Sequence, residues 1–424
     1  MTLLIKNALV FTGGKFQRLD VLIKNSKIHS LGISISFDGA DRVFDFQNKY
    51  LLIPGFVDVH VHLRQPGFSY KETIKSATLA AASAGYNALC AMPNLNPVPD
   101  CEENLQQQLD IIKRDAVVDV FPFASITRGR KGEGECVDFA GLQKNVIGFS
   151  DDGCGVQSDE LMKEAMEKCA RLGAIISAHC EVNELLNGGY IHLGKYCKEH
   201  NHKGICSESE WKQIERDCAL AGKTGCKYHV CHISTKESVD IIRRAKAQGV
   251  KVTCETAPHY LTLCDEDLQE DGRFKMNPPL RAREDMLALL QGVADGTIDV
   301  IATDHAPHSA EEKSKGLEKS AMGVVGLETA FPVLYTKLVK QGVISLERLV
   351  EMMSVRPREI FGIEGGKIEE GAPADLCALD LEKEWVVRPE EFLSMGRATP
   401  FENEKLFGKN VLTVLRGEIV YEAI

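Results

Sequence analysis

Long apolar runs are absent from this sequence of 424 residues. A helix that crosses a bilayer needs about 20 consecutive apolar residues, and we therefore expect no membrane span. A basic excess is also absent, since 50 Lys and Arg stand against 61 Asp and Glu, for a formal net charge of −11. Nucleic acids and anionic membranes attract basic proteins, so we expect neither as a partner. A small anionic substrate stays compatible with this charge, because a few local cations can hold it.

Zinc-finger and disulfide patterns are absent as well. The 14 cysteines include no Cys-x-x-Cys pair, and Cys226 and Cys231 around His229 do not have zinc-finger spacing. The first residues, MTLLIKNALVFTGGK, carry Lys6 and Asn7 inside their apolar part, which favours a strand over a secretion signal. We therefore expect a cytoplasmic protein whose cysteines are reduced and mostly buried.

The two ends of the chain show the same sequence pattern. Residues 1–54 and 365–424 alternate short β-rich runs with turns, for example DVLIKNSKIHSLG near the start and VLTVLRGEIVYE near the end. With 44% hydrophobic and 26% charged residues, the composition is that of an ordinary globular protein. We expect the two ends to form one small β-sandwich domain.

The centre, residues 55–364, has a different pattern. Short runs rich in Val, Ile and Ala alternate with helix-length stretches, several of which close on a glycine such as Gly85, Gly173 or Gly249. Eight such runs predict a catalytic (β/α)8 TIM barrel, an α/β fold. They are FVDVHVH, NALCAMPN, VVDVFPFAS, VIGFSDDG, AIISAHCE, KYHVCHIS, KVTCETAPH and DVIATDHAPH.

The predicted strands end in an unusual set of side chains. Active sites of such barrels lie at the C-terminal ends of the strands, and five of the eight ends here carry His or Asp. Imidazole and carboxylate groups suit a divalent metal, with zinc as the first candidate. Four His and two Asp exceed the needs of one tetrahedral ion, whereas two ions bridged by a carboxylate would use them all. The strand-end residues are His60, His62, Asp151, Asp152, His179, His232, Asp304, His305 and His308.

Two long motifs carry a resemblance to a known family. The stretch DVHVHLRQPG at 58–67 and the stretch TDHAPHSAEEK at 303–313 resemble the signature motifs of the dihydroorotases, within the amidohydrolase superfamily. The pieces AMPN, GFSDDG, SAHCE, CHIS, ETAPHYL and KMNPPLR follow the same family in the same order. The resemblance covers nearly the whole chain. It implies reversible, metal-dependent closure of N-carbamoyl-L-aspartate to dihydroorotate in pyrimidine synthesis.

The resemblance also implies a set of metal ligands. His60, His62 and Asp304 would hold one ion, and His179 and His232 the second. Many relatives bridge the two ions with a carboxylated lysine, but the fourth strand here ends in SDDG. The chain is similar to the branch in which an aspartate takes this place, and the spacing favours Asp152 over Asp151.

Substrate contacts follow from the same resemblance. Arg64 and Asn94, with His62 and His308 beside them, match the family's clamp for the α-carboxylate, and a guanidinium suits this task because it binds a carboxylate bidentately. Asn277 matches a contact to the ureide, while Met322 and Gly323 match backbone contacts to the ring. Asp304 is the expected general base and acid, taking a proton from water and returning it to the leaving nitrogen.

Two alternatives remain open. A hydantoinase or allantoinase would share the fold, but such relatives usually carry the bridging lysine and act on substrates without the carboxylate. A catalytically inactive homologue that partners aspartate transcarbamoylase should have lost ligands, and here all six are present. We expect an active enzyme that is a homodimer or associates with a transcarbamoylase.

Several features fit more than one role. The charged segment 308–323 is compatible with a solvated loop or a mobile cover over the site. Asp151 is expected to orient the site or cap a helix, and His259 to be structural rather than a support for a ligand. His192, His200 and His202 are expected to be solvated.

Overall fold

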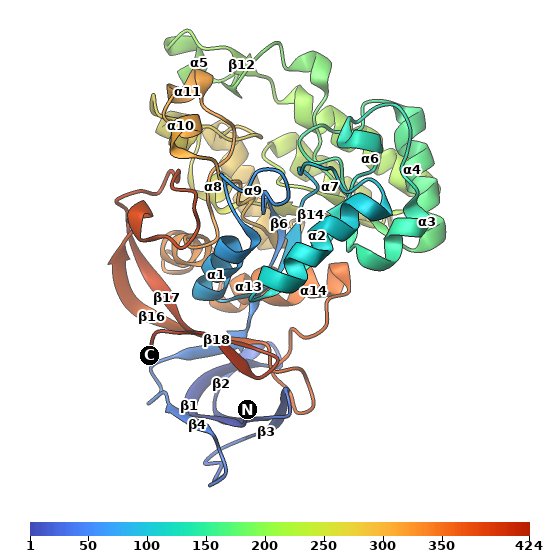
Figure 1. Cartoon of the computed structure of the whole chain (residues 1–424). Helices are drawn as coiled ribbons and strands as arrows, with labels where there is room; N and C mark the ends of the chain where they lie inside the picture. Colours follow the sequence, from blue (N-terminus) through green and yellow to red (C-terminus); the bar gives the residue numbers. More distant parts are fainter.

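The computed structural model describes residues 1–424 and confirms the predicted barrel (Figure 1). Eight parallel strands follow one another in the order β6-β7-β8-β9-β10-β13-β14-β15. All eight expected runs form strands of this sheet. Their bounds are β6 Phe56–Val61, β7 Tyr86–Ala91, β8 Asp119–Ala124, β9 Gly148–Phe149, β10 Ile175–Ala178, β13 Lys227–Val230, β14 Val252–Thr256 and β15 Val300–Ile301.

The first and last strands meet just beyond β15. Val61 forms a parallel bridge with His305, and the backbone N–H of His62 donates to the carbonyl of His305 at 2.8 Å. The barrel is therefore nearly closed, and the closing contact lies inside the two motifs that carry the polar residues. A small parallel pair, β11 Ile191–His192 and β12 Gly204–Ile205, lies apart from the barrel in the excursion after β10.

Helices surround the barrel. Four of the helix-length stretches between the predicted strands, residues 71–85, 158–173, 234–249 and 283–296, contain the helices α1, α4, α7 and α9. The α1 helix begins at a capping box on Thr73 and ends where Gly85 takes φ 93°, a left-handed conformation that glycine adopts without a steric penalty. The α-helices are α1 Ile74–Ala84, α2 Glu102–Asp115, α3 Phe139–Leu142, α4 Asp159–Leu172, α5 Lys195–Glu199, α6 Glu208–Thr224, α7 Lys236–Ala247, α8 Pro258–Thr262, α9 Arg283–Asp295, α10 Ala310–Lys313, α11 Gly316–Lys319, α12 Ala330–Leu334, α13 Leu346–Val350 and α14 Arg356–Phe361. The 3-10 and π turns are η1 Arg128–Arg130, η2 Gln143–Asn145, η3 Asn183–Leu185, η4 Asp265–Asp267, η5 Gly272–Phe274, η6 Tyr335–Val339, η7 Glu351–Val355 and η8 Pro389–Glu391.

Both chain ends build the small β-domain, which lies at the lower end of the molecule in Figure 1. Its sheet forks at β1, because the first part of β1 pairs with β4 and the second part pairs with β5. The fork lets the sheet fold over a separate core of 17 buried residues that both chain ends supply. The strands are β1 Leu3–Thr12, β2 Lys15–Lys24, β3 Lys27–Gly32, β4 Arg42–Asp45, β5 Leu51–Pro54, β16 Leu376–Val386, β17 Lys405–Leu415 and β18 Glu418–Glu422. Domain boundaries at residues 54 and 364 stay a prediction.

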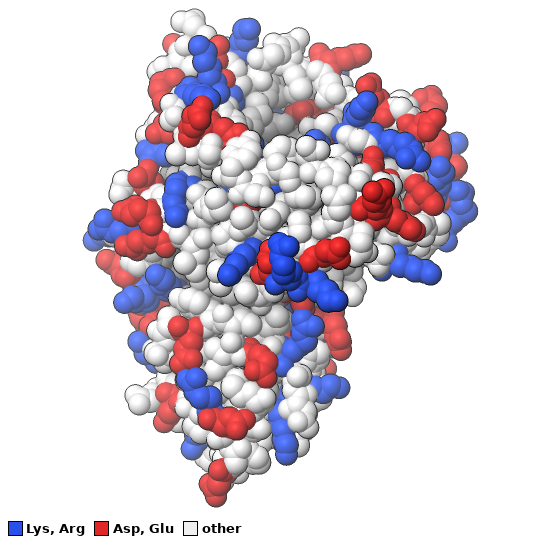
Figure 2. All heavy atoms as spheres, in the orientation of Figure 1, with Lys and Arg blue, Asp and Glu red and all other residues white.

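Polar contacts connect the two parts. The hydroxyl of Ser354 in η7 donates to the carbonyl of Pro54 on β5 at 2.8 Å, and Asn87 at the start of β7 donates to the carbonyl of Val414 on β17 at 2.9 Å. On the face drawn in Figure 2, acidic and basic side chains are interspersed, and the surface is hollowed at the upper end of the barrel. No helix of the structure is both long enough and apolar enough to cross a bilayer.

Candidate active site

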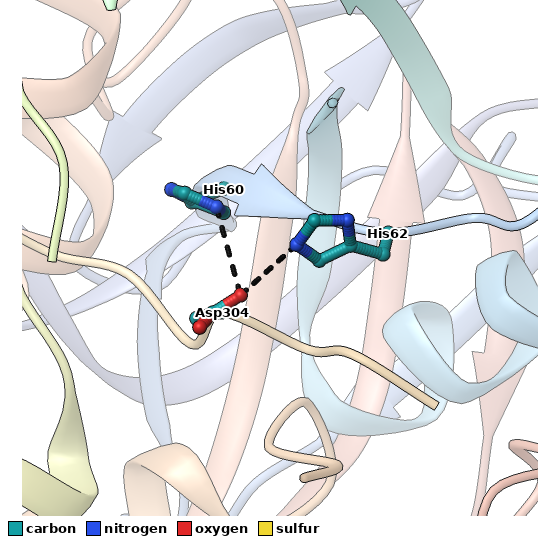
Figure 3. Close-up of side chains that lie close together, drawn as sticks. All are labelled: His60, His62 and Asp304. Atoms are coloured by element: carbon teal, nitrogen blue, oxygen red, sulfur yellow. Dashed lines mark hydrogen bonds and ion pairs between the residues drawn. The ribbon is translucent and has the colours of Figure 1, made fainter. Parts of the chain in front are cut away.

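His60, His62 and Asp304 come together at the C-terminal end of the barrel (Figure 3). His60 lies on β6, His62 follows it by two residues, and Asp304 follows β15. Oδ1 of Asp304 lies 3.1 Å from Nε2 of His62 and 3.6 Å from Nε2 of His60. The alternation of side chains along a strand places both histidines, two residues apart, on the same inner face of the barrel.

A second group lies directly beside the first. Oδ1 of Asp152 lies 3.3 Å from Nε2 of His60 and 3.6 Å from Nε2 of His232. Nδ1 of His179 lies 3.0 Å from Nε2 of His232 and 3.8 Å from Asp152. Asp152 also approaches His62, at 3.5 Å. The six residues singled out in the sequence therefore form one cluster, with Asp152 at its centre.

The cluster is buried, and its histidines shift the pKa values of its two carboxyl groups. Burial opposes ionisation of Asp304, but the hydrogen bond with His62 and the charge of His60 outweigh it and lower the pKa of Asp304 to about 2. The pKa of Asp152 also falls well below its usual range, against the effect of burial, because of His60 and His232. Both carboxyl groups are thus ionised near neutral pH and face imidazole nitrogens.

The donor atoms suit divalent metal ions. Nε2 of His60 and Oδ1 of Asp152 are buried, lie 3.3 Å apart and have no hydrogen-bond partner. Buried polar atoms without a partner are costly and rare in proteins, and ligation would satisfy both. The groups His60–His62–Asp304 and His60–Asp152–His232 each place three ligand atoms within 4.8 Å of one another. Four imidazoles and two carboxylates form a ligand set typical of zinc, manganese, iron or cobalt.

Asp151 turns away from this cluster. Its carboxylate accepts hydrogen bonds from the backbone N–H groups of Ile126, Thr127 and Gly132, at 2.7 to 3.2 Å. It therefore anchors the loop that follows β8. The two neighbouring aspartates have different roles, with Asp152 in the cluster and Asp151 holding the backbone.

Arg64 and His308 lie next to each other beside the cluster. Nε of Arg64 donates to the carbonyl of Pro307 at 3.1 Å, and its Nη2 lies 3.3 Å from Nε2 of His308. His308 also lies between the ammonium of Lys71, at 3.2 Å, and the carbonyl of Met322, at 2.8 Å. Burial and the charges of Arg64 and Lys71 lower the pKa of His308 to about 3. His308 is therefore neutral, with its Nε2–H donated to Met322.

The other expected contacts are placed as follows. Nδ2 of Asn94 donates to the carbonyl of Asp152 at 3.0 Å, while its Oδ1 is buried without a partner. Nδ2 of Asn277 donates to Glu181 at 2.7 Å. Gly323 takes φ 135°, donates its N–H to the carbonyl of Lys275 and accepts from Lys313. Their roles toward a substrate stay predictions.

Acidic residues behind the ligands were not foreseen from the sequence. Glu255 on β14 lies 2.7 Å from Nδ1 of His60, and Glu181 lies 3.7 Å from Nε2 of His179. Asp58 accepts from the backbone N–H groups of His60 and Thr303, which joins β6 to the end of β15. A signal was present, because each is an acidic residue in or directly after an apolar run.

The prediction that the three histidines after β10 are solvated is partly wrong. His192 is buried, not solvated, because it lies under Arg281, and burial together with that charge lowers the pKa of His192 to about 4. His202 is half-buried between Tyr190 and Glu270, whereas His200 is exposed as expected. His259 is buried at the start of α8 and makes no hydrogen bond to the cluster.

A parallel barrel with buried His and Asp ligands at its C-terminal end defines the class of metal-dependent amidohydrolases. The family described as Dihydro-orotase-like matches residues 49–238. A dihydroorotase from Fusobacterium nucleatum subsp. nucleatum is 50% identical over 420 residues, which are 99% of this chain and 98% of that protein. One from Bacillus thuringiensis is 48% identical over 411 residues, 96% of this chain and 95% of the relative. The chain belongs to the dihydroorotase family of cyclic amide hydrolases.

Solved structures agree on the fold. An L-hydantoinase from Arthrobacter aurescens superposes with a TM-score of 0.88 at 26% identity, covering 100% of this chain and 97% of the other. A dihydropyrimidinase from Brevibacillus agri gives a TM-score of 0.86 at 22% identity, covering 100% and 95%. The fold of the whole chain, barrel and β-domain together, is thus shared with these two structures.

Proposed function

We propose that the cluster at the barrel end performs the dihydroorotase reaction with one or two divalent ions, zinc being the first candidate. His60, His62 and Asp304 would hold one ion, His179 and His232 the other, and Asp152 would bridge them. The observation that carries the proposal is the convergence of these six buried side chains, with two orphaned ligand atoms at their centre. Such ions lower the pKa of water and polarise carbonyl groups.

Asp304 is suited to proton transfer. In ring opening, water adds to the ring carbonyl, the C–N bond breaks, and the nitrogen leaves with a proton. Asp304 would accept the proton of the water and deliver it to that nitrogen. A pKa of about 2 in the resting site keeps its carboxylate ready to accept. Closure is the reverse, in which the ureido nitrogen attacks the β-carboxyl and one of its oxygens leaves as water.

Arg64 would hold the α-carboxylate of the substrate. It is buried beside the cluster in a molecule of net charge −11, so it supplies the local cation that an anionic substrate needs. Asn94 would add a hydrogen bond, and neutral His308 keeps Arg64 free of a competing positive charge. Asn277, Met322 and Gly323 would contact the ureide and the ring.

Comparison of three substrates tests this function. The zinc-loaded enzyme is assayed with dihydroorotate, hydantoin and allantoin, together with metal analysis of the purified protein. We expect turnover of dihydroorotate, the one substrate of the three that carries a carboxylate for Arg64. Turnover of hydantoin with none of dihydroorotate would contradict the proposal and favour the hydantoinase alternative.

We further infer that the enzyme works in the cytoplasm as a homodimer or with an aspartate transcarbamoylase. All 14 cysteines are free thiols, which suits a reducing compartment. Sedimentation of the purified chain, alone and with a transcarbamoylase from the same cells, tests the assembly. A monomer under both conditions would contradict it.

A further inference from the structure

Glu255 is a buried carboxylate that touches both halves of the cluster. It lies on β14 and has no exposed surface. Its Oε1 lies 2.7 Å from Nδ1 of His60 and 3.3 Å from the backbone nitrogen of His232. Its Oε2 lies 3.1 Å from Nε2 of His229. Three N–H groups from β6, β13 and the loop after β13 therefore meet on one carboxylate.

The hydrogen bonds around Glu255 fix which nitrogen of His60 carries the proton. An ionised carboxylate only accepts hydrogen bonds, so Nδ1 of His60 is the donor. In the neutral imidazole that metal ligation requires, the lone pair of Nε2 is then free. Nε2 faces Asp152 and Asp304, at 3.3 and 3.6 Å. His229 donates through Nε2 and accepts at Nδ1 from the hydroxyl of Thr253, at 2.8 Å. This chain holds the carboxylate of Glu255 in place.

The contact with His232 acts on the backbone. His232 has φ 29°, a left-handed value that a non-glycine residue rarely adopts. Its N–H points to Glu255, while its Nε2 lies 3.6 Å from Asp152. A strained backbone conformation persists only where its surroundings hold it. By accepting the N–H of His232, the carboxylate of Glu255 helps to hold this conformation and so directs the ring of His232 toward Asp152.

We propose that Glu255 is a positioning residue that sets both metal positions at once, by orienting the ring of His60 and the backbone of His232. This inference rests on the proposed metal centre. Hydrogen-bonded carboxylates behind a histidine ligand commonly fix its tautomer, and their loss weakens metal binding by about 10–100-fold. Here one such carboxylate serves ligands of both expected ions.

A competing interpretation is that Glu255 itself belongs to a third cation site with His60 and Cys231. Both oxygens of Glu255 already accept from N–H groups. Sγ of Cys231 lies 3.1 Å from the hydroxyl of Ser177, so the thiol has a hydrogen-bond partner other than a metal. These contacts favour a support for the ligands over an additional ligand.

Two substitutions at Glu255 and one control test the proposal. Glu255→Asp keeps the charge but withdraws the carboxylate by about 1.5 Å, the length of one C–C bond. Glu255→Gln keeps the shape but removes the charge. Asp217→Asn is the matched control, since Asp217 is an equally buried carboxylate that accepts from Tyr228 and Arg216 on the outer side of β13. Circular dichroism and thermal melting establish which variants are folded.

Zinc affinity is measured by chelator competition for each ion, together with proton NMR of the metal-free proteins. We expect both ions to bind at least tenfold more weakly in Glu255→Asp and Glu255→Gln, and within threefold of wild type in the control. We also expect a low-field imidazole N–H signal from His60 that Glu255→Asp abolishes. If Glu255→Gln does not fold, Glu255→Asp alone decides.

Opposite outcomes are distinct. Wild-type affinity for either ion in Glu255→Asp would overturn the proposal. It would mean that a negative charge in this region supports metal binding even when the carboxylate no longer contacts His60 and His232. An equal loss in the Asp217→Asn control would overturn it too, since any buried carboxylate would then have the same effect. A wild-type protein that binds no divalent ion would instead overturn the proposed function itself.

Discussion

Three residues of the site adopt left-handed backbone conformations that non-glycine residues rarely take. Arg64 has φ 60°, His232 has φ 29° and Asp304 has φ 47°. Each such residue stores about 1–3 kcal/mol of strain, and such residues concentrate at functional sites. All three directly follow or lie close to a barrel strand end, where the chain must turn sharply. The left-handed backbone at these positions thus directs the side chains of Arg64, His232 and Asp304 toward the site at the barrel end.

Substitution of Asp304 separates metal binding from proton transfer. In Asp304→Asn, one oxygen still faces His62, but the amide accepts no proton from water. We expect kcat for dihydroorotate to fall by about 10²–10⁴-fold, the usual contribution of general acid–base catalysis. Zinc content should stay within a factor of two, measured by elemental analysis. Near wild-type turnover would remove Asp304 from this role.

Substitution of Arg64 tests substrate binding. Arg64→Lys keeps the charge but loses the planar pair of donors that suits a carboxylate. Hydrogen bonds to charged groups contribute about 1.5–3 kcal/mol, so kcat/KM for dihydroorotate should fall by about 10–100-fold. Arg114→Lys, at an exposed pair with Asp115, is the control and should leave the kinetics unchanged. Unaltered kinetics in Arg64→Lys would argue for a different carboxylate site.

At the scale of elements, the segment 308–323 is folded onto the barrel end. It forms the short helices α10 and α11, and the buried ammonium of Lys313 donates to three carbonyls, those of Lys275, Ala321 and Gly323, at 2.6 to 3.0 Å. The charged residues of this segment predict a solvated loop or a cover over the site. They do not indicate that Lys313 is buried and holds the segment through three hydrogen bonds.

Removal of that anchor should loosen the segment. Lys313→Met leaves the carbonyls of Ala321 and Gly323 without a donor, whereas that of Lys275 keeps the N–H of Gly323. Each unsatisfied buried group costs about 1–3 kcal/mol. We expect amide hydrogen exchange across 310–323 to accelerate at least tenfold and KM for dihydroorotate to rise. Lys315→Met, at an exposed position of the same segment, is the matched control. Equal exchange rates in both variants would mean that Lys313 does not hold the segment.

Asp285 gives a helix-level prediction for pH. It accepts from the backbone N–H of Lys236 at the start of α7, and burial raises the pKa of Asp285 to about 6. The folded state therefore binds more protons than the unfolded state between pH 4 and 6, so this group's contribution to stability decreases as the pH rises through that window. Asp285→Asn keeps the acceptor and should gain about 1–3 kcal/mol over wild type at pH 7 but little at pH 4. Urea unfolding of metal-free protein at both values measures this, and a pH-independent difference would contradict it.

At the scale of the whole molecule, the sequence predicts those features that depend on residues close together in the chain. Alternating apolar runs and closing glycines such as Gly85 predict strands and helices from neighbours in the chain. The fork of the β-sheet at β1 and the closure of the barrel through His305 depend on segments far apart, which local patterns do not encode. Glu255 was missed for the same reason, because its partners His60 and His232 meet it only in the folded barrel.

Metal removal is the prediction that involves the whole fold, since the expected ligands lie on β6 or in the segments that directly follow β6, β9, β10, β13 and β15. An ion that binds only the folded state stabilises it by about 4 kcal/mol when its free concentration is 1,000 times the dissociation constant. We expect chelation of wild-type protein to lower Tm by several degrees, and each tenfold rise in free zinc to restore a constant increment. In His60→Ala, which removes a ligand shared by both groups of the cluster, Tm should respond far less to zinc. Calorimetry across a zinc series measures both, and an equal response of the two proteins would place the stabilising ion outside this cluster.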